Sequence, residues 1–420
     1  MKAWSFCILF AAILSSSSGA ATIHVPEDLP TIGFAVWFAD DGDEIIVGPG
    51  VYTEDDVETM IDLEGKSIWI RSSDGPEVTI IDGEGLRRGV LFQSGEGGDS
   101  IIEGFTFRDC TAPWYDWNEN GQQDSWEYFG GAIWCRDGSS PTIRSCHFVN
   151  GSAEYGGAIC CFDEFFSSNE PLIENCRFIG NNVSNGVGGA LYSHSGSPTV
   201  LGCDFIDNTA GYGGAILNVA GSNPVITECL FENNSASLDA GAIYNDASMP
   251  SVSACVFINN TADDDGGAVF NADPAGNQNV PVFLECDFKG NVAGDDGGAI
   301  ANFSVSPEIS TCLISGNTAS EGGGMHSWNS SQPVLSGNLI CGNLPTQIYG
   351  SWLDDGDNEI LDECPQDCPD ATGDGVVDVN DVLAIIGAYE SDDSNADVDG
   401  SGFVDANDIL AVLAGWGICE

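Results

Sequence analysis

Short stretches of alternating apolar and polar residues recur along this chain, and one of them repeats eight times. Its consensus is Pro-x-aliphatic-x-x-Cys-x-Phe-x-x-Asn, followed by a step of small residues, usually Gly-Gly-Ala, and an aliphatic residue. Because Cys and Phe alternate with variable positions, they lie on one face of a strand, which is expected to point inward. One unit is too small to bury that face alone, so stacking of the units is predicted.

The copies follow one another at intervals of 25 to 32 residues. Strands this short at this spacing predict coils of two or three strands, stacked about 4.8 Å apart. The predicted fold class is therefore all-β, a right-handed parallel β-helix. The cysteines are expected to stack as buried thiols, and one asparagine per coil is expected to join a ladder of side-chain amides. These asparagines are Asn181, Asn208, Asn234, Asn260, Asn291, Asn317 and Asn343.

The residues before the repeat predict a different start. A short amphipathic cap is expected at residues 32–38 and a first strand at residues 44–47, with irregular coils after them. This opening resembles the N-terminal coils of pectin-lyase-like β-helix proteins. The later units resemble the Gly-Gly-Ala-Ile and Phe-x-x-Asn repeats of polymorphic outer-membrane adhesins. These resemblances imply the fold over residues 22–350 and leave the activity open, because the fold hosts many functions.

A second duplication lies near the C-terminus, with an offset of 27 residues. Each copy is a twelve-residue acidic loop with glycine at its sixth position, followed by a segment of helical periodicity. This spacing wraps six or seven oxygens around one hard cation, which predicts calcium binding. The predicted ligands are Asp370, Thr372, Asp374, Val376 through its carbonyl, Asp378 and Asp381 in the first loop, and Asp397, Asp399, Ser401, Phe403 through its carbonyl, Asp405 and Asp408 in the second.

These loops and helices resemble a type I dockerin over residues 370–417. The resemblance implies Ca²⁺ as the cofactor and a cohesin-like protein as a partner. The predicted domains are a signal peptide at 1–21, the β-helix at 22–350, an acidic linker at 351–368 and a small α-helical, dockerin-like domain with paired EF-hand loops at 369–420.

The stretch "DWNENGQQDSWE" has the same loop spacing inside the repeat region. No helix-like segment precedes it and a strand is expected soon after it, so it is not a helix-loop-helix. Two interpretations stay open: a calcium site that pins this insertion to the β-helix, or a polar insertion that matches by chance. The candidate ligands are Asp116, Asn118, Asn120, Asp124 and Glu127.

The first residues resemble a secretory signal, with Lys2, an apolar run over residues 4–14 and a tail of small residues. No stretch is long enough to span a bilayer as a helix, so a secreted, extracellular protein is expected. The chain has 65 Asp and Glu against 10 Lys and Arg, a net charge of −55. Such a charge disfavours binding to nucleic acid and attracts divalent cations. The alternative explanation for the excess of acidic residues is solubility in salty surroundings.

No motif identifies a catalytic residue. A polysaccharide lyase needs a cationic group beside a carboxylate cluster or calcium, and the candidates are Arg108, Arg136, Arg144 and Arg177. The alternative is that these arginines balance neighbouring acids. A glycoside hydrolase needs two carboxylates at a fixed separation. Just before the small-residue step, four consecutive coils carry Asp239, Asp265, Asp296 and Glu321, where the preceding four carry Phe129, Tyr155, Val187 and Tyr212.

An aromatic column follows the small-residue step and is expected to face outward by strand alternation. Exposed rings of this kind stack on sugars, and the candidate substrate-binding residues are Trp134, Tyr192, Tyr244 and Phe270. Cover by insertions or by a partner is the alternative. The four histidines, including His326 at the end of this column, are scattered and predict no metal cluster.

The favoured function is a carbohydrate-associated binding or adhesion protein, secreted and attached through its dockerin-like module. Its expected partner is a polysaccharide or a cell-surface glycan. The alternatives are a polysaccharide lyase or glycoside hydrolase acting in polysaccharide catabolism, and a purely structural spacer.

Overall fold

The structure is a computed structural model that describes residues 19–54, 57–114, 128–162, 168–276, 279–364, 371–372, 376–389, 391, 395–398, 401–414 and 417–418. The predicted signal peptide lies almost wholly outside this range. The chain divides into two compact units, residues 1–362 and 363–420. Among the described residues, none of the helices has the length and apolar character needed to cross a bilayer.

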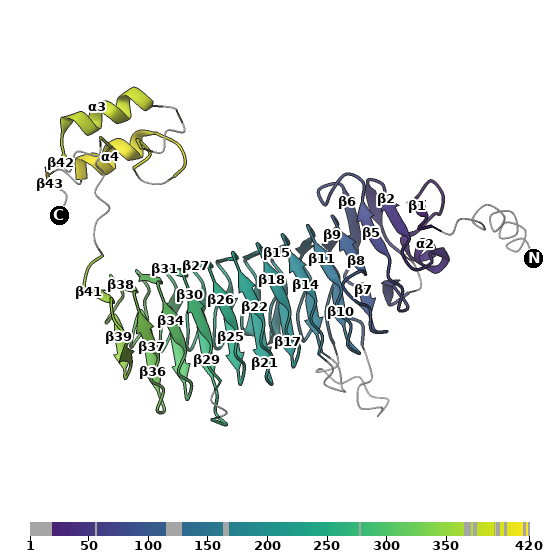
Figure 1. Cartoon of the computed structure of the whole chain (residues 1–420), viewed down its shortest axis with the longest axis horizontal. Helices are drawn as coiled ribbons and strands as arrows, with labels where there is room; N and C mark the ends of the chain where they lie inside the picture. Colours follow the sequence, from purple (N-terminus) through teal and green to yellow (C-terminus); the bar gives the residue numbers. More distant parts are fainter. Residues whose placement is uncertain are drawn as a thin grey trace, which may run out of the picture. The chain divides into compact units, whose positions relative to one another are not determined.

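The first unit is a solenoid of parallel strands, and Figure 1 shows its coils stacked from β1 to β41. Most coils contribute one strand to each of three long sheets, and residues at the same place in successive coils lie side by side in register. A fourth, shorter sheet runs along part of the stack. The predicted parallel β-helix is confirmed, because only stacking buries the alternating apolar face.

In the described residues the first sheet has 13 strands, in this order: β1 (Thr22–Val25), β2 (Glu44–Val47), β5 (Trp69–Ser72), β8 (Ile101–Glu103), β11 (Thr142–Arg144), β14 (Leu172–Glu174), β18 (Thr199–Leu201), β22 (Val225–Thr227), β26 (Ser251–Ser253), β30 (Val282–Leu284), β34 (Glu308–Ser310), β37 (Val334–Ser336) and β40 (Leu353–Asp354). The second sheet has 12: β3 (Gly50–Tyr52), β6 (Thr79–Asp82), β9 (Thr106–Arg108), β12 (His147–Val149), β15 (Arg177–Ile179), β19 (Asp204–Ile206), β23 (Leu230–Glu232), β27 (Val256–Ile258), β31 (Asp287–Lys289), β35 (Leu313–Ser315), β38 (Leu339–Cys341) and β41 (Glu359–Leu361).

The third sheet has 11 described strands: β4 (Thr59–Asp62), β7 (Arg88–Phe92), β10 (Ile133–Cys135), β13 (Ile159–Cys161), β17 (Leu191–His194), β21 (Ile216–Val219), β25 (Ile243–Asp246), β29 (Val269–Ala272), β33 (Ile300–Phe303), β36 (Met325–Trp328) and β39 (Ile348–Gly350). The short sheet has five: β16 (Asn182–Val187), β20 (Thr209–Tyr212), β24 (Ser235–Ala236), β28 (Thr261–Ala262) and β32 (Val292–Ala293). Helix α2 (Ile32–Phe38) and strand β2 have the bounds predicted for the cap and for a strand after it. The prediction that this strand is the first is wrong, because β1 precedes the cap and pairs with β2.

The interior of the β-helix is a set of ladders. Consecutive phenylalanine rings from Phe107 to Phe288 stack nearly parallel, with centroids 4.6 to 5.2 Å apart, which is the spacing of the coils. The cysteines beside them are buried free thiols, as expected. Cys229, for example, donates from Sγ to the carbonyls of Thr227 and Val200.

The predicted asparagine ladder is present and buried. Asn208 Nδ2 donates to Asn234 Oδ1 at 2.9 Å, and the same oxygen accepts from the Asn208 backbone N–H at 3.0 Å. Each amide thus satisfies the backbone of the preceding coil as well as its neighbour, which removes the cost of burying polar groups. The structure adds a ladder that the sequence analysis missed, formed by Asn218, Asn245, Asn271 and Asn302.

The small-residue step has two backbone requirements. Its first residue has a positive φ, as at Gly213 (φ 61°), and Ala240 adopts the same conformation (φ 63°) in one coil. Its second residue has no room for a side chain, since a Cβ on Gly214 would lie 2.1 Å from the Gly241 carbonyl oxygen. Glycine is therefore required at the second position by close approach of successive coils.

The predicted linker is wrong over part of its length. Residues 351–368 were expected to connect two domains, yet β40 and β41 lie in this range and continue the first and second sheets. Their side chains are exposed and acidic residues surround both strands in the sequence, so the local sequence has the composition of a linker. The backbone nevertheless pairs with the preceding coil, because the end of a stack offers unpaired donors and acceptors.

The second unit contains helices α3 (Val379–Ala388) and α4 (Ala406–Ala414), each beginning at the tenth position of one of the predicted loops. Strands β42 (Val376–Val377) and β43 (Gly417–Ile418) pair antiparallel. Its small core includes Val377 and Val404, which occupy the eighth position of each loop and are fully buried.

Candidate functional site

In each of the two C-terminal loops, the side chain of the aspartate at position twelve accepts hydrogen bonds from the backbone of the same loop. Asp381 Oδ1 accepts from the backbone N–H of Thr372 at 2.9 Å, and its Oδ2 accepts from that of Asp378 at 2.7 Å. In the second loop, Asp408 Oδ2 accepts from the backbone N–H of Asp405 at 2.8 Å. Both Asp381 and Asp408 are fully buried. These carboxylates therefore point back into their loops, although each also belongs to the first turn of a helix.

The first position of the second loop has a similar inward arrangement. The two carboxylate oxygens of Asp397 accept from the backbone N–H groups of Ser401 and Gly402, at 3.0 and 2.7 Å. The hydroxyl of Ser401 donates to the Phe403 carbonyl oxygen at 3.1 Å. Several predicted ligands thus converge in this loop. The side chain of Val376 and residues Asp370, Asp374 and Asp399 lie outside what the structure describes.

The insertion at residues 116–127 lies outside the described residues. The assignment of Asp116, Asn118, Asn120, Asp124 and Glu127 as calcium ligands therefore stays a prediction.

The predicted exposure of the aromatic column is wrong. Trp134, Tyr192 and Phe270 are 1%, 6% and 6% exposed, and Tyr244 is partly buried. The rings do lie outside the interior of the β-helix, but the residues just before the small-residue step cover them. Phe129, for example, stacks on Trp134 with centroids 5.1 Å apart. Phe129, Trp134 and Tyr192 belong to a second apolar core along one edge, Phe270 belongs to a third, and Tyr244 packs against both, so these four residues do not offer an open platform for a sugar ring.

Two arginine side chains lie against the same edge. The guanidinium groups of Arg88 and Arg136 lie 5.0 and 4.7 Å from the Trp134 ring centroid. Arg88 is buried, and burial lowers its pKa to about 10. Its Nε donates to the Gly130 carbonyl oxygen at 3.0 Å, so this arginine holds the start of the small-residue step in place.

The acidic column has the geometry of a ladder. Asp239 Oδ1 accepts from the backbone N–H of Asp265 at 3.2 Å, and Asp265 Oδ1 accepts from that of Asp296 at 3.0 Å. Burial, followed by the charges of Asp239, Asp296 and Asp295, raises the pKa of Asp265 to about 7. Burial also raises the pKa of Asp239. Carboxyl groups of successive coils therefore lie next to one another along this edge, as predicted from their positions in the repeat.

The four arginines considered for a lyase do not converge. Arg144 lies in the first sheet, Arg108 and Arg177 in the second, and Arg136 directly follows β10 of the third. Each pairs with acids close to it in the sequence or on a neighbouring coil. These pairs are Arg108 with Asp82 and Asp109, Arg136 with Asp137, Arg144 with Glu103 and Glu174, and Arg177 with Asp204. The cluster that the lyase interpretation requires is absent from the described residues.

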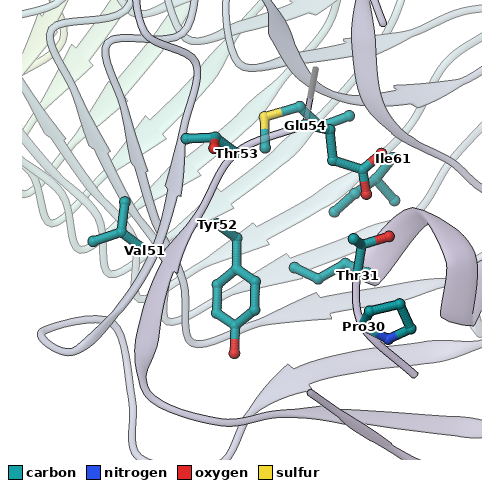
Figure 2. Close-up of a pocket in the computed structure, with 9 residues that line it drawn as sticks. Pro30, Thr31, Val51, Tyr52, Thr53, Glu54 and Ile61 are labelled. Atoms are coloured by element: carbon teal, nitrogen blue, oxygen red, sulfur yellow. The ribbon is translucent and has the colours of Figure 1, made fainter. Parts of the chain in front are cut away.

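A small cavity of about 240 Å³ lies where the N-terminal cap meets the first coils. Figure 2 shows Tyr52, Glu54 and Thr31 around it. The Tyr52 hydroxyl donates to the Gly48 carbonyl oxygen, Glu54 Oε1 accepts from the Gly33 N–H, and Thr31 Oγ1 accepts from the Phe34 N–H. All three polar side chains therefore fasten backbone segments of the cap, which is a structural role.

The parallel sheets, the in-register ladders and the capped first coil define this protein as a parallel β-solenoid. The family described as right handed beta helix region matches residues 58–205 and 130–280, which together are more than half of the chain. The chain belongs to this family.

Two solved structures similar to the chain are named as an alginate lyase and a pectin methylesterase. One is a PL6 family alginate lyase, AlyGC, with 13% identity and a TM-score of 0.36, over 82% of this chain and 51% of that chain. The other is the pectin methylesterase from carrot, with 12% identity and a TM-score of 0.30, over 84% of this chain and 91% of that chain. The chain spans about half the length of the alginate lyase, and likeness at this level identifies no activity. Among curated protein sequences, none matches.

Proposed function

We propose that this is a secreted β-helix protein whose C-terminal unit binds calcium and attaches it to a partner, while the β-helix associates with extracellular carbohydrate. The observation that carries the proposal is the burial of Asp381 and Asp408 at position twelve of both loops. A buried carboxylate is costly unless it is hydrogen-bonded and neutralised. Calcium within each loop provides that neutralisation, since its preferred ligands are carboxylate and carbonyl oxygens.

The fit of calcium rests on residues of both loops. Asp381 and Asp378 in the first loop, and Asp397, Asp405 and Asp408 in the second, would supply carboxylate oxygens. Asp370, Asp374 and Asp399 would complete the sets by their place in the sequence. Calcium would add charge neutralisation and would fasten each loop to the helix that follows it.

Secretion is part of the same proposal. Besides the signal-like first residues, Cys341 and Cys364 each take part in a disulfide bond. Disulfides persist in oxidising compartments such as the extracellular space.

A protein partner is supported by apolar side chains on the surface of the second unit. Helix α3 exposes Val379, Leu383 and Ile386 to between 54% and 59%. Their spacing places them along one face of the helix. Exposed apolar faces of this kind mark interaction sites. The dockerin-like sequence points to a cohesin-like protein as the occupant, and Val379 is itself the tenth position of the first loop, between Asp378 and Asp381.

Calcium titration of the full chain tests the calcium proposal. Calcium at a hundredfold excess over its Kd is expected to stabilise the second unit by about 2.7 kcal/mol for each occupied loop. The double variant Asp381→Asn, Asp408→Asn is expected to lose most of this gain, whereas the exposed Asp99→Asn is expected to keep it. Equal calcium-induced shifts of Tm in the three proteins would refute the proposal.

Incubation with a panel of acidic and neutral polysaccharides tests the carbohydrate part, with calcium or with a chelator. Retention of the protein without change in the polysaccharide is the expected result. Unsaturated uronate ends would instead identify a lyase, and new reducing ends without unsaturation would identify a hydrolase. Absence of retention on every polysaccharide would contradict the carbohydrate part and favour the alternative that the β-helix is a purely structural spacer.

A further inference from the structure

The end of the acidic column contains a group of three side chains that no calcium loop includes. Asp296 and Glu321 come from adjacent coils, whose backbones pair at these two residues. His326 lies on β36, five residues after Glu321. The two carboxylates and the imidazole each offer a ligand atom, and all three atoms lie within 4.8 Å of one another.

The fold explains why these side chains meet. In an earlier coil, Phe129 precedes the small-residue step and stacks on Trp134, five residues later. The same step separates Glu321 from His326, so the acidic residues cover the histidine as Phe129 covers the tryptophan. The neighbouring residue of His326 in β33 is Ala301, whose small side chain leaves the imidazole uncrowded on that side.

The imidazole is buried and one of its nitrogens lacks a hydrogen bond. His326 is 5% exposed. Its Nδ1 lies 3.0 Å from Asp296 Oδ2. The geometry at Nδ1 nevertheless satisfies no hydrogen bond within the described residues. Buried polar atoms are nearly always hydrogen-bonded, so a buried nitrogen that lies 3.0 Å from a carboxylate oxygen without forming a hydrogen bond calls for an explanation.

The ring of His326 is held in place from its other sides. Its centroid is 4.8 Å from the Trp328 ring and 4.9 Å from the Tyr349 ring, the latter edge-to-face. No lysine or arginine of the described chain forms an ion pair with Asp296 or Glu321. The group therefore combines a nitrogen ligand in a fixed position with two carboxylates that no lysine or arginine of the described residues neutralises.

We infer that Asp296, Glu321 and His326 bind a divalent transition-metal ion, with zinc as the best fit. An imidazole nitrogen favours zinc and its neighbours over calcium, which prefers oxygen alone. Ligand bonds of about 2.0–2.2 Å place adjacent ligand atoms about 3.3–3.6 Å apart, a spacing these side chains reach with small rotations. Three protein ligands leave a coordination position open to water or to an oxygen of a bound molecule.

Zinc titration of the full chain by calorimetry tests this site, in the presence of enough calcium to saturate oxygen-only sites. One equivalent of zinc is expected to bind the native protein at least tenfold more tightly than it binds His326→Ala. The variant Glu321→Gln is expected to show a similar loss, and because this side chain is exposed, its fold is expected to be unchanged. His24→Ala is the matched control, since His24 also lies beside one carboxylate, that of Asp28, but on the surface.

Unchanged zinc affinity in both His326→Ala and Glu321→Gln would overturn the inference, and so would complete displacement of zinc by calcium. The double variant Asp381→Asn, Asp408→Asn separates this site from the C-terminal loops. Its zinc affinity is expected to match that of the native protein. A parallel loss of zinc and calcium binding in that variant would place the zinc in the loops and overturn the inference.

Discussion

One edge of the β-helix has two different halves on the same backbone. Just before the small-residue step, the earlier coils carry Phe129, Tyr155, Val187 and Tyr212, and the later coils carry Asp239, Asp265, Asp296 and Glu321. Parallel bridges join Phe129, Tyr155 and Val187 in the earlier half and Asp296 and Glu321 in the later half. The earlier half covers a second apolar core with rings, whereas the later half accumulates carboxylates, one of which has a pKa raised to about 7.

This difference shows which parts of a coil are free to change. Phenylalanine, cysteine and asparagine ladders hold the interior of both halves, so the edge is not needed to define the coil. The earlier half uses that freedom for packing, and the later half for charge. Since repeat proteins gain stability from contacts between neighbouring coils, each half can specialise without disturbing the other.

Removal of a ring from the aromatic half is expected to have the largest effect. Trp134→Ala is expected to lower the free energy of unfolding by about 3–5 kcal/mol, because the ring is buried between Phe129 and two arginines. Trp37→Ala is the control, since Trp37 is 63% exposed. Urea unfolding followed by circular dichroism measures both. Similar losses in the two variants would mean that the aromatic edge is not a core.

A change to the shared backbone step is expected to be intermediate and equal in the two halves. An added Cβ would lie 2.1 Å from a carbonyl oxygen at Gly214, in the aromatic half, and 2.4 Å from one at Gly298, in the acidic half. Gly214→Ala and Gly298→Ala are each expected to cost about 1–3 kcal/mol through overpacking. Gly97→Ala, where nothing lies within 4 Å, is the control. A large difference between the first two would show that the halves differ in backbone as well as in side chains.

The smallest expected effect belongs to the acidic half. Burial raises the pKa of Asp239 above its ordinary value of 3.8, so the folded protein binds this proton more tightly than the unfolded chain does. Stability from this group is therefore present below pH 3.8 and is lost as pH rises through the raised pKa. Asp239→Asn keeps the acceptor for Asp265 and is expected to gain about 0.5 kcal/mol at neutral pH.

The gain of Asp239→Asn is expected to shrink as pH falls toward 3.8, since the native carboxyl is then neutral too. Thermal unfolding of both proteins across this range measures the difference. A gain that is independent of pH would locate the effect in packing and not in charge.

The internal ladders could be predicted because their residues repeat in type and in spacing. Phe231, Cys229 and Asn234 each have a residue of the same type at the same position of the neighbouring units. Stacking of the units therefore brings residues of the same type into contact. The outward edge could not be predicted in the same way. Alternation correctly placed Trp134 outside the interior, but whether it is exposed depends on the ring five residues earlier, across a glycine step.

Strand alternation and a recurring unit were enough to determine the parallel β-helix and its amide ladder, because these follow from local geometry repeated along the chain. The C-terminal helices followed from the paired loops for the same reason. Only the tertiary structure decided that β40 and β41 extend the coils into acidic sequence and that the aromatic column is covered. It also brought His326 beneath Asp296 and Glu321. These outcomes depend on which side chains meet across coils, and that proximity is a property of the folded stack and not of any single repeat.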